Sequence, residues 1–186
     1  MLPNKIIVLD RDGVINEDSD DFIKSPEEWL PIDGSLKAIS LLHRAGYRVV
    51  VATNQSGVAR GLFDEITLAL IHGKMIEMVE AEGGHIEGVF YCPHGPHDGC
   101  DCRKPKAGLL RRISFEFQAD ITGCYLIGDS IRDLQAATSA RLSPVLVRTG
   151  KGKEAESQLF KAGFPDIPVF DDLLDAVVNF GLLKDV

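Results

Sequence analysis

The sequence predicts an α/β fold in which a parallel sheet carries helices on both of its faces. Short β-branched apolar runs, such as KIIVLD at residues 5–10 and RVVVATN at residues 48–54, are typical of strands buried on both faces. Segments with helical spacing lie between these runs, and this alternation favours right-handed crossovers and a parallel sheet. With 186 residues, 45% hydrophobic and 26% charged, the chain fits one domain over residues 1–186.

The first half of the chain predicts three strands and two helices. Residues 34–46 (GSLKAISLLHRAG) predict a helix with Ser35 as its N-cap and Gly46 as its stop. In residues 64–81 the apolar side chains gather near one helical face, and Gly83 and Gly84 end that helix. The strands are expected at residues 5–10, 48–54 and 88–92.

The second half continues the alternation without a repeat, a low-complexity segment or a linker. Short apolar runs predict strands at residues 124–129 and 144–147, with a further one near Val169. Helices are expected at residues 107–117, 132–140, 154–161 and 173–180.

Charge and hydrophobicity limit the partners and the compartment. The formal net charge of -8 argues against nucleic acid, which binds a basic face. No apolar run approaches the ~20 residues that span a bilayer. The first residues, MLPNKIIVLD, lack the basic region and apolar core of a signal peptide. We therefore expect a cytoplasmic protein with no membrane partner, whose cysteines stay reduced.

Polar side chains follow the predicted strands at the edge where an open α/β sheet binds its ligands. Asp10 and Asp12 lie one residue apart, and two carboxylates this close repel unless a cation sits between them. Asp129, after another strand, would complete an oxygen cage for Mg²⁺. If a helix starts near Ser130, Asp133 would orient the metal or its waters. The alternative is that these aspartates only cap helices.

Thr53 and Lys104 are expected at the same edge. A hydroxyl and an ammonium suit a phosphoryl group, whose charge spreads over three oxygens. Arg103 has the planar fork that binds a second anionic group. Taken alone, each of these residues would equally fit a solvated loop.

The loop CPHGPHDGCDCRKP at residues 92–105 holds three of the four cysteines. Cys92-x-His94 and Cys100-x-Cys102 are two ligand pairs separated by five residues, a set that suits tetrahedral Zn²⁺ in a closed structural site. His97 is a competing ligand, and a redox-active thiol loop is an alternative to a metal site. A disulfide is disfavoured by the expected compartment.

The predicted zinc loop, residues 92–102, runs directly into Arg103 and Lys104. A loop rich in Gly and Pro has no core of its own, so a bound metal would fix it and position these two cations. Cys124 lies in a predicted strand and is expected to be a small core residue.

The motif DRDGVIN at residues 10–16 resembles the DxDGT/V signature of the haloacid dehalogenase superfamily of phosphatases. TNQSG at residues 53–57 resembles its second motif, Lys104 its third and GDSIRD at residues 128–133 its fourth, in the same order. The resemblance implies a Rossmann-like sheet and a phosphoric monoester hydrolase.

The same resemblance assigns roles to matching residues. Asp10 would be the nucleophile that forms an aspartyl-phosphate, and Asp12 the general acid/base. Thr53 and Lys104 would stabilise the transferring phosphoryl group. Asp10, the backbone carbonyl of Asp12 and Asp129 would hold catalytic Mg²⁺.

The cysteine loop resembles that of the small histidinol-phosphate and heptose-bisphosphate phosphatases, and this resemblance makes Cys92, His94, Cys100 and Cys102 the ligands of a structural Zn²⁺. TNQSGVARGLF resembles TNQSGIARG of the heptose-bisphosphate enzymes, whereas the histidinol-phosphate enzymes tend to TNQDGLG.

The segment after Thr53 is therefore expected to contact substrate through Asn54, Gln55 and Ser56, with Arg103 at the substrate's far end. A serine at position 56 tolerates a second phosphate, whereas an aspartate favours a cationic amine. We favour removal of the C7 phosphate of a heptose 1,7-bisphosphate, in the synthesis of ADP-heptose and the lipopolysaccharide core. Histidinol phosphate is the alternative substrate.

Several alternatives stay open. The acidic run EDSDDFIKSPEEW departs from the usual heptose-enzyme pattern, and would be a solvated loop or would bind sugar hydroxyls. The chain has no room for a large cap, so the site would be open and the protein a monomer. Non-enzyme hypotheses are a zinc-binding interaction module and an inactive scaffold of the superfamily. A further enzymatic alternative is phosphoryl transfer to an acceptor other than water.

Overall fold

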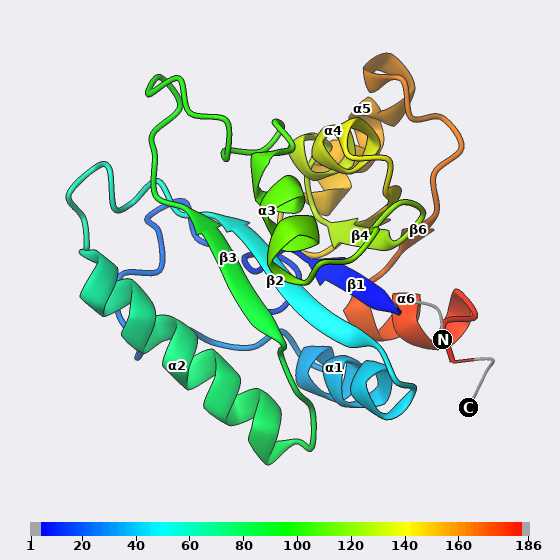
Figure 1. Cartoon of the computed structure of the whole chain (residues 1–186), viewed down its shortest axis with the longest axis horizontal. Helices are drawn as coiled ribbons and strands as arrows, with labels where there is room; N and C mark the ends of the chain where they lie inside the picture. Colours follow the sequence, from blue (N-terminus) through cyan, green and yellow to red (C-terminus); the bar gives the residue numbers. More distant parts are fainter. Residues whose placement is uncertain (1–4, 184–186) are drawn as a thin grey trace.

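The computed structural model describes residues 5–183 and contains a six-stranded sheet (Figure 1). All neighbouring strands are parallel, in the order β3-β2-β1-β4-β5-β6. This confirms the predicted fold class, and the order 3-2-1-4-5-6 is that of Rossmann folds. The strands are β1 (Ile6–Leu9), β2 (Arg48–Asn54), β3 (Gly88–Cys92), β4 (Tyr125–Gly128), β5 (Ser143–Val147) and β6 (Val169–Phe170). The outermost residues of the predicted domain, 1–4 and 184–186, lie outside the described part.

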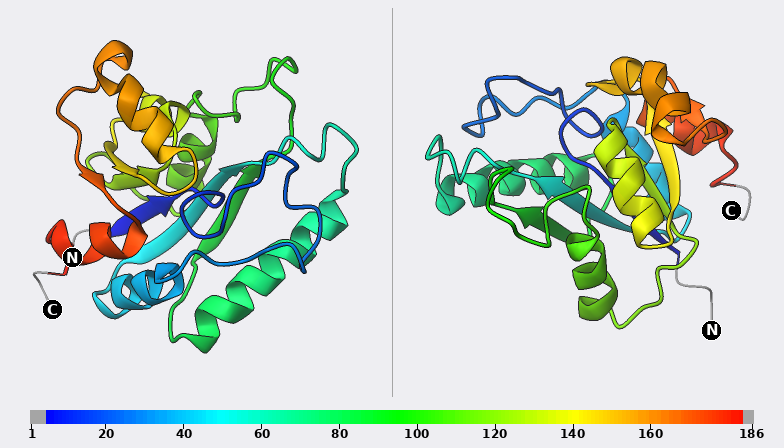
Figure 2. Two further views of the ribbon diagram at one scale, coloured as in Figure 1. Left: turned by 180° about the vertical axis from the view of Figure 1, so that it is seen from behind. Right: turned by 90° about the horizontal axis from the view of Figure 1, so that it is seen from above.

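Helices cover both faces of the sheet (Figure 2). They are α1 (Ser35–Arg44), α2 (Glu65–Ala81), α3 (Gly108–Glu116), α4 (Ile131–Ser139), α5 (Gly152–Ala162) and α6 (Leu173–Asn179). Side chains alternate along β1, so Ile7 and Leu9 pack with α1, α2 and α6, whereas Ile6 and Val8 pack with α3 and α4. Among the described residues, no helix combines the length and the apolar character that crossing a membrane requires.

The start of α1 differs from the prediction. Gly34, with φ 80°, is the N-cap, and Ser35 is the first helical residue. The Ser35 hydroxyl donates instead to the buried carbonyl of Ile15 at 2.6 Å. That carbonyl also accepts from the Ile32 N–H at 3.0 Å, so the hydroxyl is its second donor, and this tertiary contact overrides the capping preference of serine.

The site lies where the strand order of the sheet reverses, between β1 and β4. The chain winds outward from β1 in one direction and from β4 in the other, which leaves a crevice at the carboxyl ends of these two neighbours. Asp10 follows β1 and Asp129 follows β4. Within residues 5–183, the segments that rise from this edge carry turns and isolated bridges but no inserted cap domain.

Candidate active site and metal sites

A pocket of about 280 Å³ lies at the carboxyl edge of the sheet and brings the predicted polar segments together. Its lining includes every residue for which the sequence predicts a role in catalysis, magnesium binding or substrate binding: Asp10, Asp12, Thr53, Asn54, Gln55, Ser56, Arg103, Lys104 and Asp129. Segments far apart in the chain therefore contribute to one site, as expected for a parallel sheet.

Asp10 is held at the centre of the pocket. Its backbone N–H donates to Ile127 on β4 at 3.0 Å, which extends the sheet by one residue. Its Oδ1 accepts from the Arg11 backbone N–H at 2.7 Å and lies 2.9 Å from Lys104 Nζ. Burial and the Asp133 carboxylate raise the pKa of Asp10 well above its ordinary range.

Lys104 is a buried cation that contacts polar groups from three separate segments. Its Nζ lies 2.9 Å from Asp10 and 2.6 Å from Asp133, and it donates to the carbonyl of Ala52 at 2.7 Å. Burial alone would lower the pKa of Lys104, but the two carboxylates outweigh it and raise the pKa. The side chain therefore stays charged and fixed beside Asp10.

The Asp12 carboxylate has hydrogen-bond partners of its own. Its Oδ1 accepts from Arg11 Nε at 3.1 Å, Arg11 Nη2 at 2.8 Å and Asn16 Nδ2 at 3.0 Å. Its Oδ2 accepts from Gln55 Nε2 at 2.8 Å, and Gln55 also donates to Thr53 Oγ1 at 2.9 Å. Burial raises the pKa of Asp12, but the Arg11 charge and these hydrogen bonds outweigh it and lower the pKa.

Three carboxylates, those of Asp10, Asp129 and Asp133, bring oxygen atoms within 4.8 Å of one another. Burial and the Asp133 charge raise the pKa of Asp129 to about 7. When all three are ionised, Lys104 offsets only one of their charges. Such a cluster of hard oxygens suits a divalent cation like Mg²⁺. The Asp12 carboxylate lies outside the cluster, so Asp12 has only its backbone carbonyl to offer a metal.

Asp133 also caps a helix, the alternative role that the sequence leaves open for aspartates at this edge. Its Oδ2 accepts from the Ser130 backbone N–H at 3.1 Å and from the Ser130 hydroxyl at 2.5 Å, which forms a capping box at the start of α4. The helix cap and the ion pair with Lys104 together fix this member of the carboxylate cluster.

The loop after β5 also reaches the site, which the sequence reasoning missed. Lys151 N–H donates to Asp129 Oδ2 at 2.8 Å. Gly13 and Gly150 pack against the same oxygen with φ of 79° and 54°, and a Cβ on either would overlap it. The Thr149-Gly150 pair, one residue beyond the end of β5, was the available signal for this contact.

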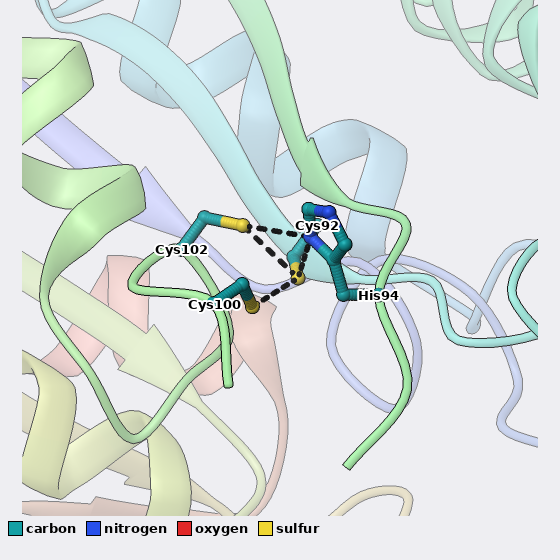
Figure 3. Close-up of side chains that lie close together, drawn as sticks. All are labelled: Cys92, His94, Cys100 and Cys102. Atoms are coloured by element: carbon teal, nitrogen blue, oxygen red, sulfur yellow. Dashed lines mark hydrogen bonds between the residues drawn. The ribbon is translucent and has the colours of Figure 1, made fainter. Parts of the chain in front are cut away.

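The cysteine loop forms a second cluster (Figure 3). Ligand atoms of Cys92, His94, Cys100 and Cys102 lie within 4.8 Å of one another and point toward a common centre. Neighbouring atoms are 3.2 to 3.6 Å apart. His97, the competing ligand, is not in this group.

These four side chains fit a tetrahedral zinc ion. With Zn–S of about 2.3 Å and Zn–N of about 2.1 Å, the ligand atoms of a tetrahedron lie roughly 3.6 to 3.8 Å apart, close to the spacing of these four. Burial and the Cys102 thiol raise the pKa of Cys92 to about 12, so a nearby cation is needed to ionise it. Cys92, Cys100 and Cys102 form no disulfide. Cys124 packs partly buried against the core outside this cluster.

Comparison with known proteins identifies the family of this chain. A family model described as HAD-hydrolase-like matches residues 101–176. D-glycero-beta-D-manno-heptose-1,7-bisphosphate 7-phosphatase of Pseudomonas aeruginosa is 49% identical over 183 residues, which cover 98% of this chain and 100% of that protein. The chain belongs to the heptose-bisphosphate phosphatase family of the haloacid dehalogenase superfamily.

Two further heptose-bisphosphate phosphatases extend the comparison. The Bordetella bronchiseptica enzyme of the same name is 52% identical over 162 residues, covering 87% of this chain and 89% of the relative. A crystal structure of D,D-heptose 1,7-bisphosphate phosphatase from B. bronchiseptica, complexed with magnesium and phosphate, matches with a TM-score of 0.91. That match has 49% identity and covers 98% of this chain and 99% of the other.

In this member of the heptose-bisphosphate phosphatase family, the pocket rim carries three guanidinium groups. Arg60 and Arg132 line the pocket with Arg103, although only Arg103 is predicted there from the sequence. Arg103 Nη1 donates to the carbonyl of His94 at 3.3 Å, which ties it to the cysteine loop. Burial and the charge of Arg132 lower the pKa of Arg103. The rim therefore favours an anion.

The acidic run also reaches the pocket. Asp18 Oδ2 and Asp20 Oδ1 each lie 3.3 Å from Lys151 Nζ, and all three residues line the pocket. Asp18 is 20% exposed and Asp20 94% exposed. The hypothesis of a plain solvated loop therefore fits Asp20 but not Asp18.

Proposed function

We propose that this protein is an Mg²⁺-dependent phosphatase that removes the C7 phosphate of D-glycero-D-manno-heptose 1,7-bisphosphate. The observation that carries the proposal is the pocket in which Asp10, Asp12, Lys104 and Asp129 meet, in a chain 49% identical to a heptose-bisphosphate phosphatase over nearly its whole length. The enzyme would act in the synthesis of ADP-heptose for the lipopolysaccharide core.

The reaction runs in two steps on Asp10. Its carboxylate attacks phosphorus and the bond from phosphorus to the C7 oxygen breaks, while the protonated form of Asp12 gives its proton to that oxygen as the sugar leaves. Asp12 then takes a proton from the water that hydrolyses the aspartyl-phosphate. Lys104 Nζ, 2.9 Å from Asp10, and the Thr53 hydroxyl bind the phosphoryl oxygens. Thr53 is free to donate because its Oγ1 already accepts from Gln55.

Magnesium would be held by the carboxylates of Asp10 and Asp129, with the backbone carbonyl of Asp12. The shared negative charge of the carboxylate cluster supports this assignment. When bound, the ion neutralises the repulsion between the Asp10 carboxylate and the phosphate. Asp133 would hold Lys104 in place through the ion pair between their side chains.

Zinc would be held by Cys92, His94, Cys100 and Cys102 as a structural ion. The support is a complete set of four protein ligand atoms, which leaves no open position for chemistry. Fixing this loop fixes Arg103 through the His94 carbonyl.

The second phosphate of the substrate would bind the rim formed by Arg60, Arg103 and Arg132. This positive rim favours the bisphosphate over histidinol phosphate, because an amine cation would face three guanidinium groups there. Ser56, a small hydroxyl in the same pocket, leaves room for that phosphate. Asp18 is placed to accept hydrogen bonds from sugar hydroxyls.

We further propose that residues 1–186 act as one domain, as a monomer and in the cytoplasm. The single parallel sheet that runs through the described residues supports the first point. A pocket built from one chain needs no partner. A cytoplasmic location would keep the zinc-binding thiols reduced.

The direct test is to follow the reaction by ³¹P NMR with heptose 1,7-bisphosphate and Mg²⁺. We expect the C7 phosphate resonance to disappear while the anomeric C1 phosphate stays on the sugar. The Asp10→Asn variant should fold, keep its zinc and release no phosphate. Loss of the C1 phosphate would refute the proposed regiochemistry. Turnover by the Asp10→Asn variant would refute Asp10 as the nucleophile.

A further inference from the structure

Arg11 lies between Asp10 and Asp12 in sequence and lines the pocket, and its guanidinium is bound to other side chains of the protein. Its side chain is 1% exposed, and a buried guanidinium needs partners for its donors. Nε and Nη2 both donate to Asp12 Oδ1. The remaining side of the fork, Nη1, lies 3.2 Å from Nε2 of His72 on α2.

His72 is a buried histidine that the proposed reaction does not use. It is 7% exposed and its ring packs at 5.8 Å against that of Tyr91. Arginine can only donate, so His72 Nε2 accepts and Nδ1 carries the ring proton. Burial and the Arg11 charge lower the pKa of His72 to about 3, so the ring stays neutral and keeps this lone pair.

The chain of contacts ends on one oxygen of Asp12. Oδ1 receives three donors, two from Arg11 and one from Asn16, whereas Oδ2 receives one, from Gln55. The carboxylate is thereby held in one orientation, with the less occupied oxygen as the one able to serve the reacting groups. If Arg11 were free to turn about its long side chain, only the hydrogen bonds from Asn16 and Gln55 would hold this orientation, and the carboxylate would be less firmly fixed.

We propose that His72 is a positioning residue for catalysis: by accepting from Arg11 Nη1 it locks the guanidinium onto Asp12 Oδ1 and so presents Oδ2 to the leaving-group oxygen. The inference rests on the proposed role of Asp12. A histidine that only filled space would need its volume, whereas this role needs an acceptor at the position of Nε2.

Three substitutions separate these two roles. In His72→Gln the amide oxygen reaches roughly as far as Nε2, whereas His72→Leu fills space without an acceptor and His72→Asn is polar but too short. Each variant is compared with the wild type on heptose bisphosphate and on p-nitrophenyl phosphate, whose phenolate leaves without a proton. The value kcat/KM reports the first phosphoryl transfer, and thermal unfolding and zinc content control for the fold.

We expect His72→Leu and His72→Asn to lose about tenfold or more in kcat/KM on heptose bisphosphate, with His72→Gln within about threefold of wild type. On p-nitrophenyl phosphate all three should stay within about threefold, because that leaving group does not need the acid. If His72→Leu fails to fold, the Asn and Gln pair carries the test.

Equal losses on both substrates, or equal activity of the Asn and Gln variants, would overturn the role of His72. A wild type inactive on heptose bisphosphate would instead overturn the proposed substrate. The His72 comparison would then be made on an aliphatic phosphate monoester that the wild type hydrolyses.

Discussion

The side-chain amide of Asn54 holds Lys104 by both polar groups of its backbone. Nδ2 donates to the Lys104 carbonyl at 3.1 Å, and Oδ1 accepts from the Lys104 N–H at 3.0 Å. The last residue of β2 is thus joined to Lys104, two residues after Cys102. Asn54, which the sequence predicts to bind substrate, lines the pocket and also forms this clamp on the backbone of Lys104, whose Nζ lies 2.9 Å from Asp10.

Breaking this clamp should slow catalysis without removing zinc. Asn54→Leu loses both hydrogen bonds, and we expect kcat to fall about 10- to 100-fold as Lys104 shifts from the phosphoryl group. Asn54→Asp keeps an oxygen that can accept from the Lys104 N–H, so its kcat should fall less. Steady-state kinetics with metal analysis checks this. Unchanged kcat in Asn54→Leu would show that Lys104 is held by its ammonium contacts alone.

Removing a cysteine ligand should affect the loop first and catalysis second. We expect Cys100→Ser to lose zinc, unfold at a lower temperature and show a higher KM and lower kcat, since Arg103 and Lys104 follow the loop. Cys124→Ser, outside the cluster, is the matched control and should keep its zinc. Full activity in a zinc-free Cys100→Ser protein would contradict the scaffolding role.

Stability without magnesium should depend on pH through Asp129. Its pKa is raised from an ordinary value of 3.8 to about 7 by burial and by Asp133. Between these values the folded state binds more protons than the unfolded state, so the free energy of unfolding falls as pH rises from about 4 to about 7. One group contributes at most about 1.4 kcal/mol per pH unit.

Urea unfolding at several pH values measures this slope. Asp129→Asn should flatten it, and added Mg²⁺ should stabilise the wild type more at pH 8 than at pH 5, where protons compete for the carboxylates. A slope of the opposite sign, or an identical slope in Asp129→Asn, would show that another group dominates.

Binding of the substrate's second phosphate should depend on Arg103. Arg103→Met keeps much of the side chain's length without its charge, and we expect KM for the bisphosphate to rise about tenfold or more. For a sugar monophosphate KM should change little, because no second anion meets the rim. Equal effects on both substrates would place Arg103 at the transferred phosphate instead.

The parallel sheet explains why much of the site could be predicted. Strand ends are readable from apolar runs, and a parallel sheet must bring them to one edge, so the sequence alone is enough to place Asp10, Thr53 and Asp129 together. The cysteine cluster follows from ligand spacing. In both cases the side chains are short, so the position of the backbone largely determines where their polar atoms lie.

The remaining features depend on contacts that the sequence does not encode locally. His72 reaches Arg11 across 61 residues, and no periodicity reveals that pair. The long side chains of Arg60 and Arg132 enter the pocket from segments whose local pattern predicts only helix or loop. Ser35 has the residue type of a cap, but its hydroxyl donates to the Ile15 carbonyl, a tertiary contact that the local sequence does not reveal.

The most direct test of the proposed function is phosphate release from heptose 1,7-bisphosphate and histidinol phosphate, measured side by side with Mg²⁺ present. We expect kcat/KM to favour the bisphosphate by about a hundredfold or more, since three guanidinium groups attract its second phosphate and repel an amine. A preference for histidinol phosphate would leave the fold and the catalytic residues in place. It would contradict the proposed substrate.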